Sequence, residues 1–598
     1  MKISNVISKY SGYTNRLEVT NTPDPSYMVS GSKNVVLDWL NSLSSRRGFS
    51  ILGGVGALGG VKGRAKWRTS RGQFYNFRKV AQKVQLLRTV GTVKSWVDLP
   101  FVDGTSFLPV SGQITTFANI FNDTRKIDEI LFAGGNVRFF SWSGASGSVV
   151  SSAVGTITLD SGLGAKGFTA TGNVYVNGVV YAYTGITGSQ FTGVTPSAAG
   201  LAVGAFACEG VKSNAIASIP ANFTCDYVGV YRNQAYLGSD TSRMVLVSSA
   251  INYTDFLTST AVGGPRTLTF DDNCAGFEAS KSSMVCFGKT ESIFVIKYTI
   301  SADQTKEFFE IERLATSPNQ GVISPLAKIR VKNAMMYITQ ERTLDTVEFV
   351  ENISDEQTVP ISDLIKNDFD SLNFTGACVD YWQRNVLVSI PASNVCYMYD
   401  MERKVWQAPI VWNGATIGMF SVDENNNLIG HDAFKDQSYL MFSGTSDGGA
   451  AIESVAVFAY DNFGDRFALK QFTKYVQDGY ISAGGVLTQV IDYDFRGKKG
   501  SITHTFSGSE LSYVYNVTDS GGFGKAHLGE RPLSGSSLLP SEEDRRFRFG
   551  DSFPPQEFYE SRTTYSMSTV DGTWRLVAFG NDAVITNTQI NDITRVLE

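Results

Sequence analysis

Few residues of this chain have types and spacings that could carry out catalysis. The 598 residues include three histidines, His431, His504 and His527, and a serine–histidine–aspartate mechanism would have to use one of them. None lies in a nucleophile elbow or at the spacing of a histidine metal site. The carboxylate pairs of glycosidases are defined by their separation in space, which a sequence does not show. We therefore predict that the protein is not an enzyme.

Two other patterns match cofactor sites only formally. Gly54, Gly56 and Gly59 have the spacing of a dinucleotide-binding loop, but no β-α-β pattern surrounds them and no acidic residue follows about twenty positions later. The six cysteines are widely spaced and contain no Cys-x-x-Cys pair. They predict reduced, buried thiols. We expect neither a cofactor nor a metal.

The most polarised feature is a basic segment. No Asp or Glu occurs between Trp39 and Val97, whereas this window holds twelve Lys and Arg residues. Such a segment attracts phosphate, acidic protein or anionic lipid. We favour contact with an acidic neighbouring subunit or adaptor over contact with DNA in a channel, because basic walls would slow DNA transit. The residues predicted to make this contact are Arg46, Arg47, Lys62, Arg64, Lys66, Arg68, Arg71, Arg78 and Lys79.

The composition predicts that mainly β-structure positions these residues. Charged residues make up 18% of the chain and aromatic residues 12%, and 58 residues are glycine. This mixture suits short strands joined by tight turns. The length favours two to four domains. No apolar run reaches the length of a membrane span, and the first residues lack the apolar core of a signal peptide.

The clearest unit extends from Cys225 to Phe256. It contains three short β-rich runs, DYVGVY, AYLG and RMVLVS, separated by turns at 232–234 and 238–240. Comparable units recur every 40–50 residues or so from residue 70 onward, which is typical of propeller blades. We predict a β-propeller of about six or seven blades.

This unit also resembles a known family. The resemblance lies in Tyr231, Arg232, Tyr236, Gly238, Ser239, Arg243, Ser248, Tyr253, Asp255 and Phe256, and in an earlier group formed by Asn34, Val35, Arg46, Arg47, Gly48 and Phe49. Both groups are similar to the β-propeller tail proteins of bacteriophages, in particular the nozzle proteins, or tail tubular protein B, of short-tailed phages. A third pattern, residues 445–449, matches the core of a sialidase Asp box but lacks the aromatic residue that should follow.

The domain organisation follows from changes in composition along the chain. We expect an extended N-terminal arm with the basic segment over 1–69, including a short helix at 35–43, and a β-propeller over 70–450. Residues 146–205 lose almost all charge and alternate with period two around Asn177-Gly178, which predicts a small β-insertion. Residues 451–598 predict a β-sandwich-like domain.

The resemblance implies a structural role in a phage tail. It predicts a nozzle or hub subunit that forms a homo-oligomeric ring, by resemblance a hexamer. The ring would extend the channel through which phage DNA transiently passes, and would hold the adaptor and fibres. The protein would be made in the host cytoplasm and reside in the virion. Two alternatives remain open: a receptor-binding or fibre-anchoring virion protein, and a propeller glycosidase.

Overall fold

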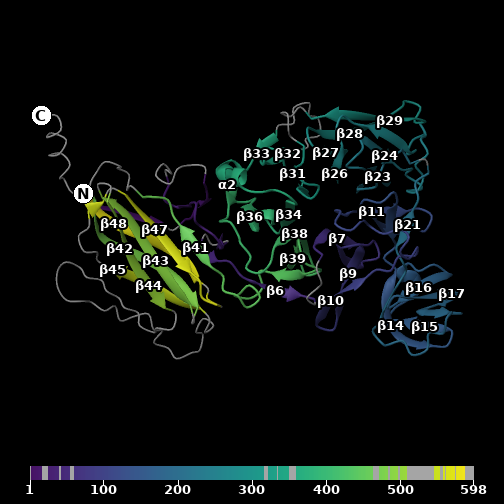
Figure 1. Ribbon diagram of the computed structural model, residues 1–598, viewed down its shortest axis with the longest axis horizontal. Coiled ribbons are helices and arrows are strands. Elements are labelled where there is room, and N and C mark those ends of the chain that lie inside the picture. The colour runs from purple at the N-terminus through teal and green to yellow at the C-terminus, as the bar shows by residue number, and fades with distance from the viewer. Residues whose placement is uncertain are drawn as a thin grey trace.

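The structure is a computed structural model of the chain. It describes residues 2–7, 9–15, 24–38, 42–53, 59–217, 219–314, 321–332, 334–348, 358–461, 470–482, 485–495, 498–507, 544–551, 557–558, 560–570, 572 and 574–585. Almost all elements in these ranges are strands. The molecule is elongated, with a β-sandwich at one end, a propeller in the middle and a small β-unit at the other end (Figure 1).

Seven four-stranded antiparallel sheets of the described residues form the propeller. The first three blades are β7–β10 (Val61–Arg68, Phe74–Val80, Lys83–Val90, Val93–Asp98), β11–β13 with β21 (Thr116–Asn122, Ile127–Ala133, Phe139–Trp142, Lys212–Asn214) and β22–β25 (Tyr227–Tyr231, Gln234–Gly238, Met244–Val247, Arg266–Thr269). Blades four and five are β26–β29 (Cys274–Ala279, Met284–Gly288, Ile293–Ile300, Glu307–Arg313) and β30–β33 (Lys328–Val331, Ala334–Ile338, Leu344–Glu348, Thr358–Pro360). Blade six is β34–β37 (Cys378–Trp382, Asn385–Ile390, Val395–Asp400, Val405–Trp406).

The seventh blade closes the ring with a strand from the other end of the chain. Its inner strands are β38 (Ile417–Val422), β39 (Leu428–Asp432) and β40 (Ser438–Met441), and its outermost strand is β6 (Phe49–Leu52). The innermost strands β7, β11, β26, β34 and β38 surround a common centre in Figure 1, and β38 packs against β7. The predicted propeller is therefore confirmed, with seven blades in the described chain.

Local turn chemistry explains the hairpins. Arg232 and Asn233 have φ angles of 51° and 60° and form the two-residue connection between β22 and β23. Positive φ at both positions is the requirement of a type I′ turn, whose twist matches that of the strands. The Asn177-Gly178 turn between β16 (Gly172–Val176) and β17 (Val179–Tyr183) has the same property, with φ angles of 49° and 82°.

The β-insertion leaves blade two between β13 and β21. Its sheet contains β14 (Ser146–Ala153), β15 (Thr156–Leu159), β16, β17, β18 (Gly185–Thr187), β19 (Gln190–Thr192) and β20 (Phe206–Cys208), and a short helix α1 (Leu163–Lys166) follows β15. The insertion has its own hydrophobic cluster, which includes Ile157, Val174 and Phe191. It forms the lower right end of the molecule in Figure 1.

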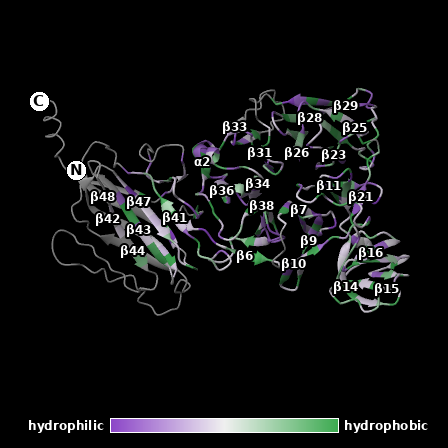
Figure 2. Cartoon of the chain, in the orientation of Figure 1, coloured by the Kyte–Doolittle hydropathy of each residue, from purple (hydrophilic) through white to green (hydrophobic). Residues whose placement is uncertain are grey.

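The sandwich consists of two sheets. One contains β41 (Ser454–Val457), β43 (Val486–Phe495), β44 (Lys498–Ser507) and β47 (Glu560–Met567). The other contains β42 (Lys470–Ser482), β45 (Asp544–Asp551), β46 (Glu557–Phe558) and β48 (Trp574–Ile585), together with N-terminal strands β1 (Lys2–Ile7), β4 (Val35–Leu37) and β5 (Leu43–Ser45). Strands of both domains carry the hydrophobic residues drawn green in Figure 2.

The N-terminal region differs from the arm expected over 1–69. It is divided among the sandwich (β1, β4, β5), blade seven (β6) and blade one (β7), and its β2 (Gly12–Tyr13) and β3 (Tyr27–Met28) pair with each other. The helix expected at 35–43 is absent from its described part, where β4 and β5 pair antiparallel. Strand edges of the sandwich and of blade seven need partners, and this segment supplies them.

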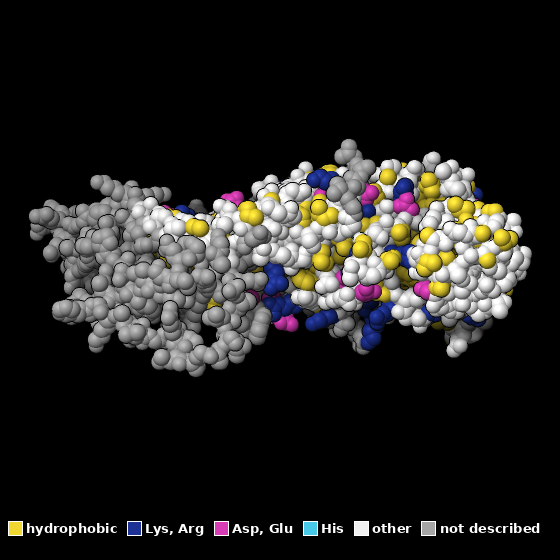
Figure 3. All heavy atoms as spheres, turned by 90° about the horizontal axis from the view of Figure 1, so that it is seen from below, with side chains coloured by type: hydrophobic (Ala, Val, Ile, Leu, Met, Phe, Trp, Pro, Cys, Tyr) yellow, Lys and Arg dark blue, Asp and Glu magenta, His cyan; other side chains and the backbone are white. Residues whose placement is uncertain are grey.

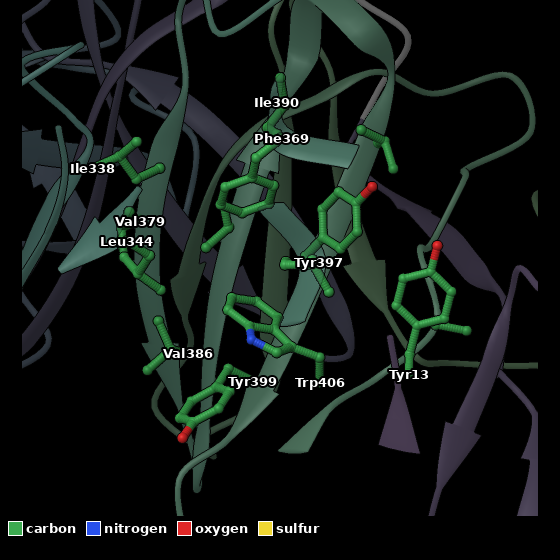
Figure 4. Packing of buried hydrophobic residues seen from close by; sticks show 14 of the residues in the cluster. Tyr13, Ile338, Leu344, Phe369, Val379, Val386, Ile390, Tyr397, Tyr399 and Trp406 are labelled. Atoms are coloured by element: carbon green, nitrogen blue, oxygen red, sulfur yellow. The ribbon is translucent and has the colours of Figure 1, made fainter. Parts of the chain in front are cut away.

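The propeller and sandwich share one hydrophobic cluster. It joins Val386 and Trp406 of blade six to Tyr565 and Trp574 of the sandwich. At this junction Tyr13 lies beside Tyr397 (Figure 4). Tyr13 also donates a hydrogen bond of 2.7 Å to Asp368 of α2 (Lys366–Ser371). The two domains are therefore packed as one body.

Candidate functional site: the basic segment and the propeller axis

Part of the basic segment lies inside the ring closure. Arg64, Lys66 and Arg68 alternate along β7, so they share one face of this innermost strand. That face adjoins blade seven, because the opposite face, at Gly63, lies against Thr115 and Phe117 of blade two. The acidic partners of the segment come mostly from the far end of the propeller, which is why none was needed nearby in the sequence.

Arg46 is completely enclosed by its partners. Its guanidinium donates to both carboxylate oxygens of Asp447, with Nη1 2.7 Å from Oδ1, and neither side chain is exposed. Nε donates to Asn34 and Nη2 donates to the carbonyl of Val411. Removing one partner of a buried, fully hydrogen-bonded ion pair of this kind strongly destabilises the fold. The pair joins the start of the propeller to its end.

Three further contacts repeat this pattern. Arg78 pairs with Asp436 of the β39–β40 connection at 2.5 Å, Lys94 pairs with Asp423 at 2.7 Å, and the Lys62 ammonium donates to the carbonyl of Ala433. The side chains of Asp423 and Arg78 are almost wholly buried. Blade one is therefore joined to blade seven by charge as well as by strand packing.

Arg64 reaches past blade seven. Its guanidinium forms an ion pair with Asp380 on β34 of blade six, while blade seven separates blades one and six in the ring order. Asp380 also accepts a hydrogen bond of 2.8 Å from the backbone N–H of Phe420 on β38. The ion pair thus lies at the propeller axis and links three blades.

Lys79 is the clearest example of a residue of this segment that is buried within the chain. Its side chain is fully buried, and its ammonium donates to the carbonyls of Val110 and Gln113 at 2.7 Å each. Burial lowers the pKa of Lys79 to about 8, and the nearby Lys62 ammonium adds to the shift.

The predicted contact residues therefore divide into two groups. Arg46, Arg78 and Lys79 are buried within the chain, so they have no surface to offer to another subunit, and our expectation is corrected for these three. Arg47, Lys66 and Arg68 are exposed, and Lys62, Arg64 and Arg71 are half-buried. For these six residues, contact with a subunit or adaptor stays a prediction.

Four charged residues near the axis were not singled out in the sequence. Glu278 lies on β26, Lys328 and Arg330 lie on β30, and Asp380 lies on β34. Each strand is innermost in its blade. Charged residues at alternate positions of short apolar strands, as in Lys328-Ile329-Arg330, are the sequence feature that indicates such positions.

The residues that were considered as catalytic, cofactor or metal sites in the sequence are next described in the fold. His431 is fully buried on β39, between the hydroxyls of Ser421 and Ser438. Asp447, in the segment that matches the Asp-box core, accepts a hydrogen bond from Arg46. Gly54 and Gly56 lie outside the described residues. All six cysteines are free and buried, and no group of three potential metal ligands occurs among the described residues.

The surface of the insertion is unusually apolar. Val150, Val154, Val179, Val180 and Val203 are exposed, Val154 and Val203 to 78%. Hydrophobic side chains are spread over this end in Figure 3.

Where the insertion meets blade one, a cavity of about 430 Å³ is lined in part by Val97, Asp98, Tyr175 and Phe206.

Comparisons with known proteins add little to these observations. No protein-family model matches the chain, and no curated protein matches it. Two solved structures that it is similar to are the WD40 β-propeller domain of Doa1 (TM-score 0.31, 7% identity, 66% of this chain and 97% of that chain) and BBS1N in complex with ARL6DN (TM-score 0.31, 10% identity, 67% and 99%). Within the described residues, no helix is long and apolar enough to span a membrane.

Proposed function

We propose that this chain is a structural protein of a bacteriophage tail. It would act as a nozzle or hub subunit and assemble into a closed homo-oligomeric ring, by resemblance a hexamer. This ring would hold the adaptor and fibres while phage DNA passes through it. It would be made in the host cytoplasm and reside in the virion. The resemblance of the Tyr231–Phe256 and Asn34–Phe49 segments to phage propeller proteins motivates this proposal.

The observation that carries the proposal is the way the N-terminal segment joins the domains. Within about fifty residues it supplies β1, β4 and β5 to the sandwich and β6 to the last blade. A pull on the sandwich is thereby transmitted through paired strands into the propeller. This construction suits a part that bears mechanical load, and it needs no substrate site.

The axis of the single propeller would not serve as the DNA channel. The Arg64–Asp380 pair joins the innermost strands of blades one and six beside it, and the seven innermost strands of a propeller enclose too little space for a duplex. DNA would instead pass through the centre of the ring of subunits. The propellers would then form the wall of that ring.

The exposed valines of the insertion fit a contact with a neighbouring subunit. Exposed apolar residues that gather on one surface mark protein interfaces, and these five belong to one compact unit. The same surface is the feature that favours the second candidate, a fibre-anchoring protein.

A variant pair tests the ring. Val154→Asp combined with Val203→Asp should leave the chain folded but monomeric in mass measurements on the purified protein. The matched control is Ile251→Asp, since Ile251 is 76% exposed on blade three, and it should assemble normally. Rings formed equally well by all three proteins would refute the role of the insertion. A wild-type chain that stays monomeric at high concentration would argue against the ring itself.

A further inference from the structure

More positively than negatively charged side chains lie at the propeller axis. Arg64 and Lys66 project from one face of β7, and Lys328 and Arg330 occupy alternate positions of β30. Glu278 interacts electrostatically with Arg64, Lys328 and Arg330, and Lys66 interacts with Arg64. These five side chains, with Asp380, are called the axial cluster below.

The two carboxylates of the axial cluster do not balance its four cations. Asp380 is engaged by Arg64. Glu278 makes no hydrogen bond within the described chain, and burial raises its pKa although three cations lie near it. With every group in its usual charge state, four cations and two carboxylates leave the axial cluster with an excess of two positive charges.

Apart from Arg64, the cations of the axial cluster form no ion pair among the described residues. The buried Lys328 ammonium donates to the carbonyl of Ala275 at 3.1 Å and to that of Pro325. Arg330 donates to the carbonyls of Lys332 and Ala279. Lys66 has no ion pair among the described residues, and Nε of Arg64 is buried without a hydrogen-bond acceptor. Burial lowers the pKa of both Lys66 and Lys328.

We propose that the axial cluster binds a phosphate group at the end of the propeller axis where Lys66 and Arg330 are exposed. A phosphate monoanion or dianion matches the excess charge. Its oxygens would accept hydrogen bonds from the Arg330 guanidinium and the Lys66 ammonium, which are the donors that recognise phosphate best. The phosphate could be a free ion or belong to a nucleic acid backbone.

The ion pair of Arg64 with Asp380 would form the floor of this site. Asp380 is held by the N–H of Phe420 at 2.8 Å, so it keeps Arg64 in place. The site would therefore be preorganised by blades one, six and seven, and completed by blades four and five. This inference concerns the isolated chain and does not depend on ring formation.

Binding can be measured by calorimetry on the full chain with inorganic phosphate, and in parallel with a short single-stranded oligonucleotide, in a chloride buffer. We expect phosphate to bind, and Lys66→Gln and Arg330→Gln each to weaken binding about tenfold, the loss of one charge-assisted hydrogen bond. Both side chains are exposed, so the variants should fold. Lys306→Gln is the control, since Lys306 is exposed on blade four away from the axial cluster, and it should bind as the wild type does.

The variant Glu278→Gln distinguishes a local effect on phosphate binding from a general loss of stability. Replacing the carboxyl by an amide removes the one carboxylate of the axial cluster that is not in an ion pair, so phosphate should bind as tightly as before or more tightly. Variant-sensitive binding of the oligonucleotide alone would identify the backbone phosphate as the source. The inference is overturned if neither probe binds above the chloride background, or if both axial variants bind like Lys306→Gln.

Discussion

Arg46 and Asp447 lie 401 positions apart in the sequence, yet their side chains meet in a two-pronged ion pair that is closed to solvent. Arg46 precedes β6, the strand that completes blade seven, and Asp447 follows β40, the strand with which β6 pairs. The pair therefore fastens the closure of the ring at the point where both chain ends pass from the propeller into the sandwich.

Breaking this pair from one side should be strongly destabilising. Arg46→Met leaves a buried carboxylate without its counter-charge, which costs about 3–5 kcal/mol in the free energy of unfolding. Denaturant unfolding followed by tryptophan fluorescence measures the change. The double variant Arg46→Met with Asp447→Asn removes both charges and should recover much of the loss. An unfolding midpoint of Arg46→Met equal to that of the wild type would show that the pair does not fasten the closure.

The propeller and sandwich should unfold together. Trp574 is buried in the sandwich, and its indole N–H donates to Ser454 at 2.8 Å. It belongs to the same hydrophobic cluster as Trp406 of blade six. Trp574→Ala should cost about 3–5 kcal/mol and shift a single calorimetric transition as a whole. Val570→Ala, at a half-exposed site, is the control and should change little. A scan in which one of two separate transitions moves would contradict a shared core.

The insertion should be removable. Ser148 pairs with Phe206 and Gly147 pairs with Ala207 where the insertion begins and ends, so its two chain ends are adjacent. Replacing residues 148–206 by Asn-Gly provides a two-residue turn between paired strands. We expect a soluble chain whose circular dichroism and proteolysis pattern retain the propeller. Aggregation of this variant, with the intact protein soluble in the same buffer, would mean that the insertion is part of the propeller core.

Stability should fall in mild acid because of His431. Burial holds the pKa of His431 well below its usual value, and the nearby Arg78 and Arg64 charges add to this effect. The unfolded imidazole, with a pKa of about 6.5, binds a proton that the folded one does not. The free energy of unfolding should therefore decrease as the pH falls below about 6.5, by up to about 1.4 kcal/mol per pH unit. His431→Gln should flatten this slope between pH 5 and 7, and an unchanged slope would exclude His431 as its cause.

Local features of the fold could be predicted from the sequence, whereas long-range pairing could not. The Arg232-Asn233 and Asn177-Gly178 turns follow from residue types that accept positive φ, and the short strands follow from alternation between such turns. The strands β1, β5 and β6 are short, and each pairs with a strand hundreds of residues away. Nothing in a window of local sequence distinguishes them from an extended arm or, at 35–43, from a helix.

The same limit applies to the charges. The sequence shows that no Asp or Glu lies between Trp39 and Val97, but acidic partners for this segment could equally belong to another molecule. Four of the acids that pair with this window, Asp380, Asp423, Asp436 and Asp447, lie within one later stretch of the chain. Only the circular order of the blades brings the two stretches together.

Imaging of virions that carry this chain, labelled with an antibody fragment against the insertion, tests the proposed role most directly. The account predicts label in a ring around the tail axis, with several copies arranged symmetrically around a central opening that can admit duplex DNA. Label confined to appendages at the side of the tail, or a purified chain that cleaves a glycan and never forms rings, would contradict it.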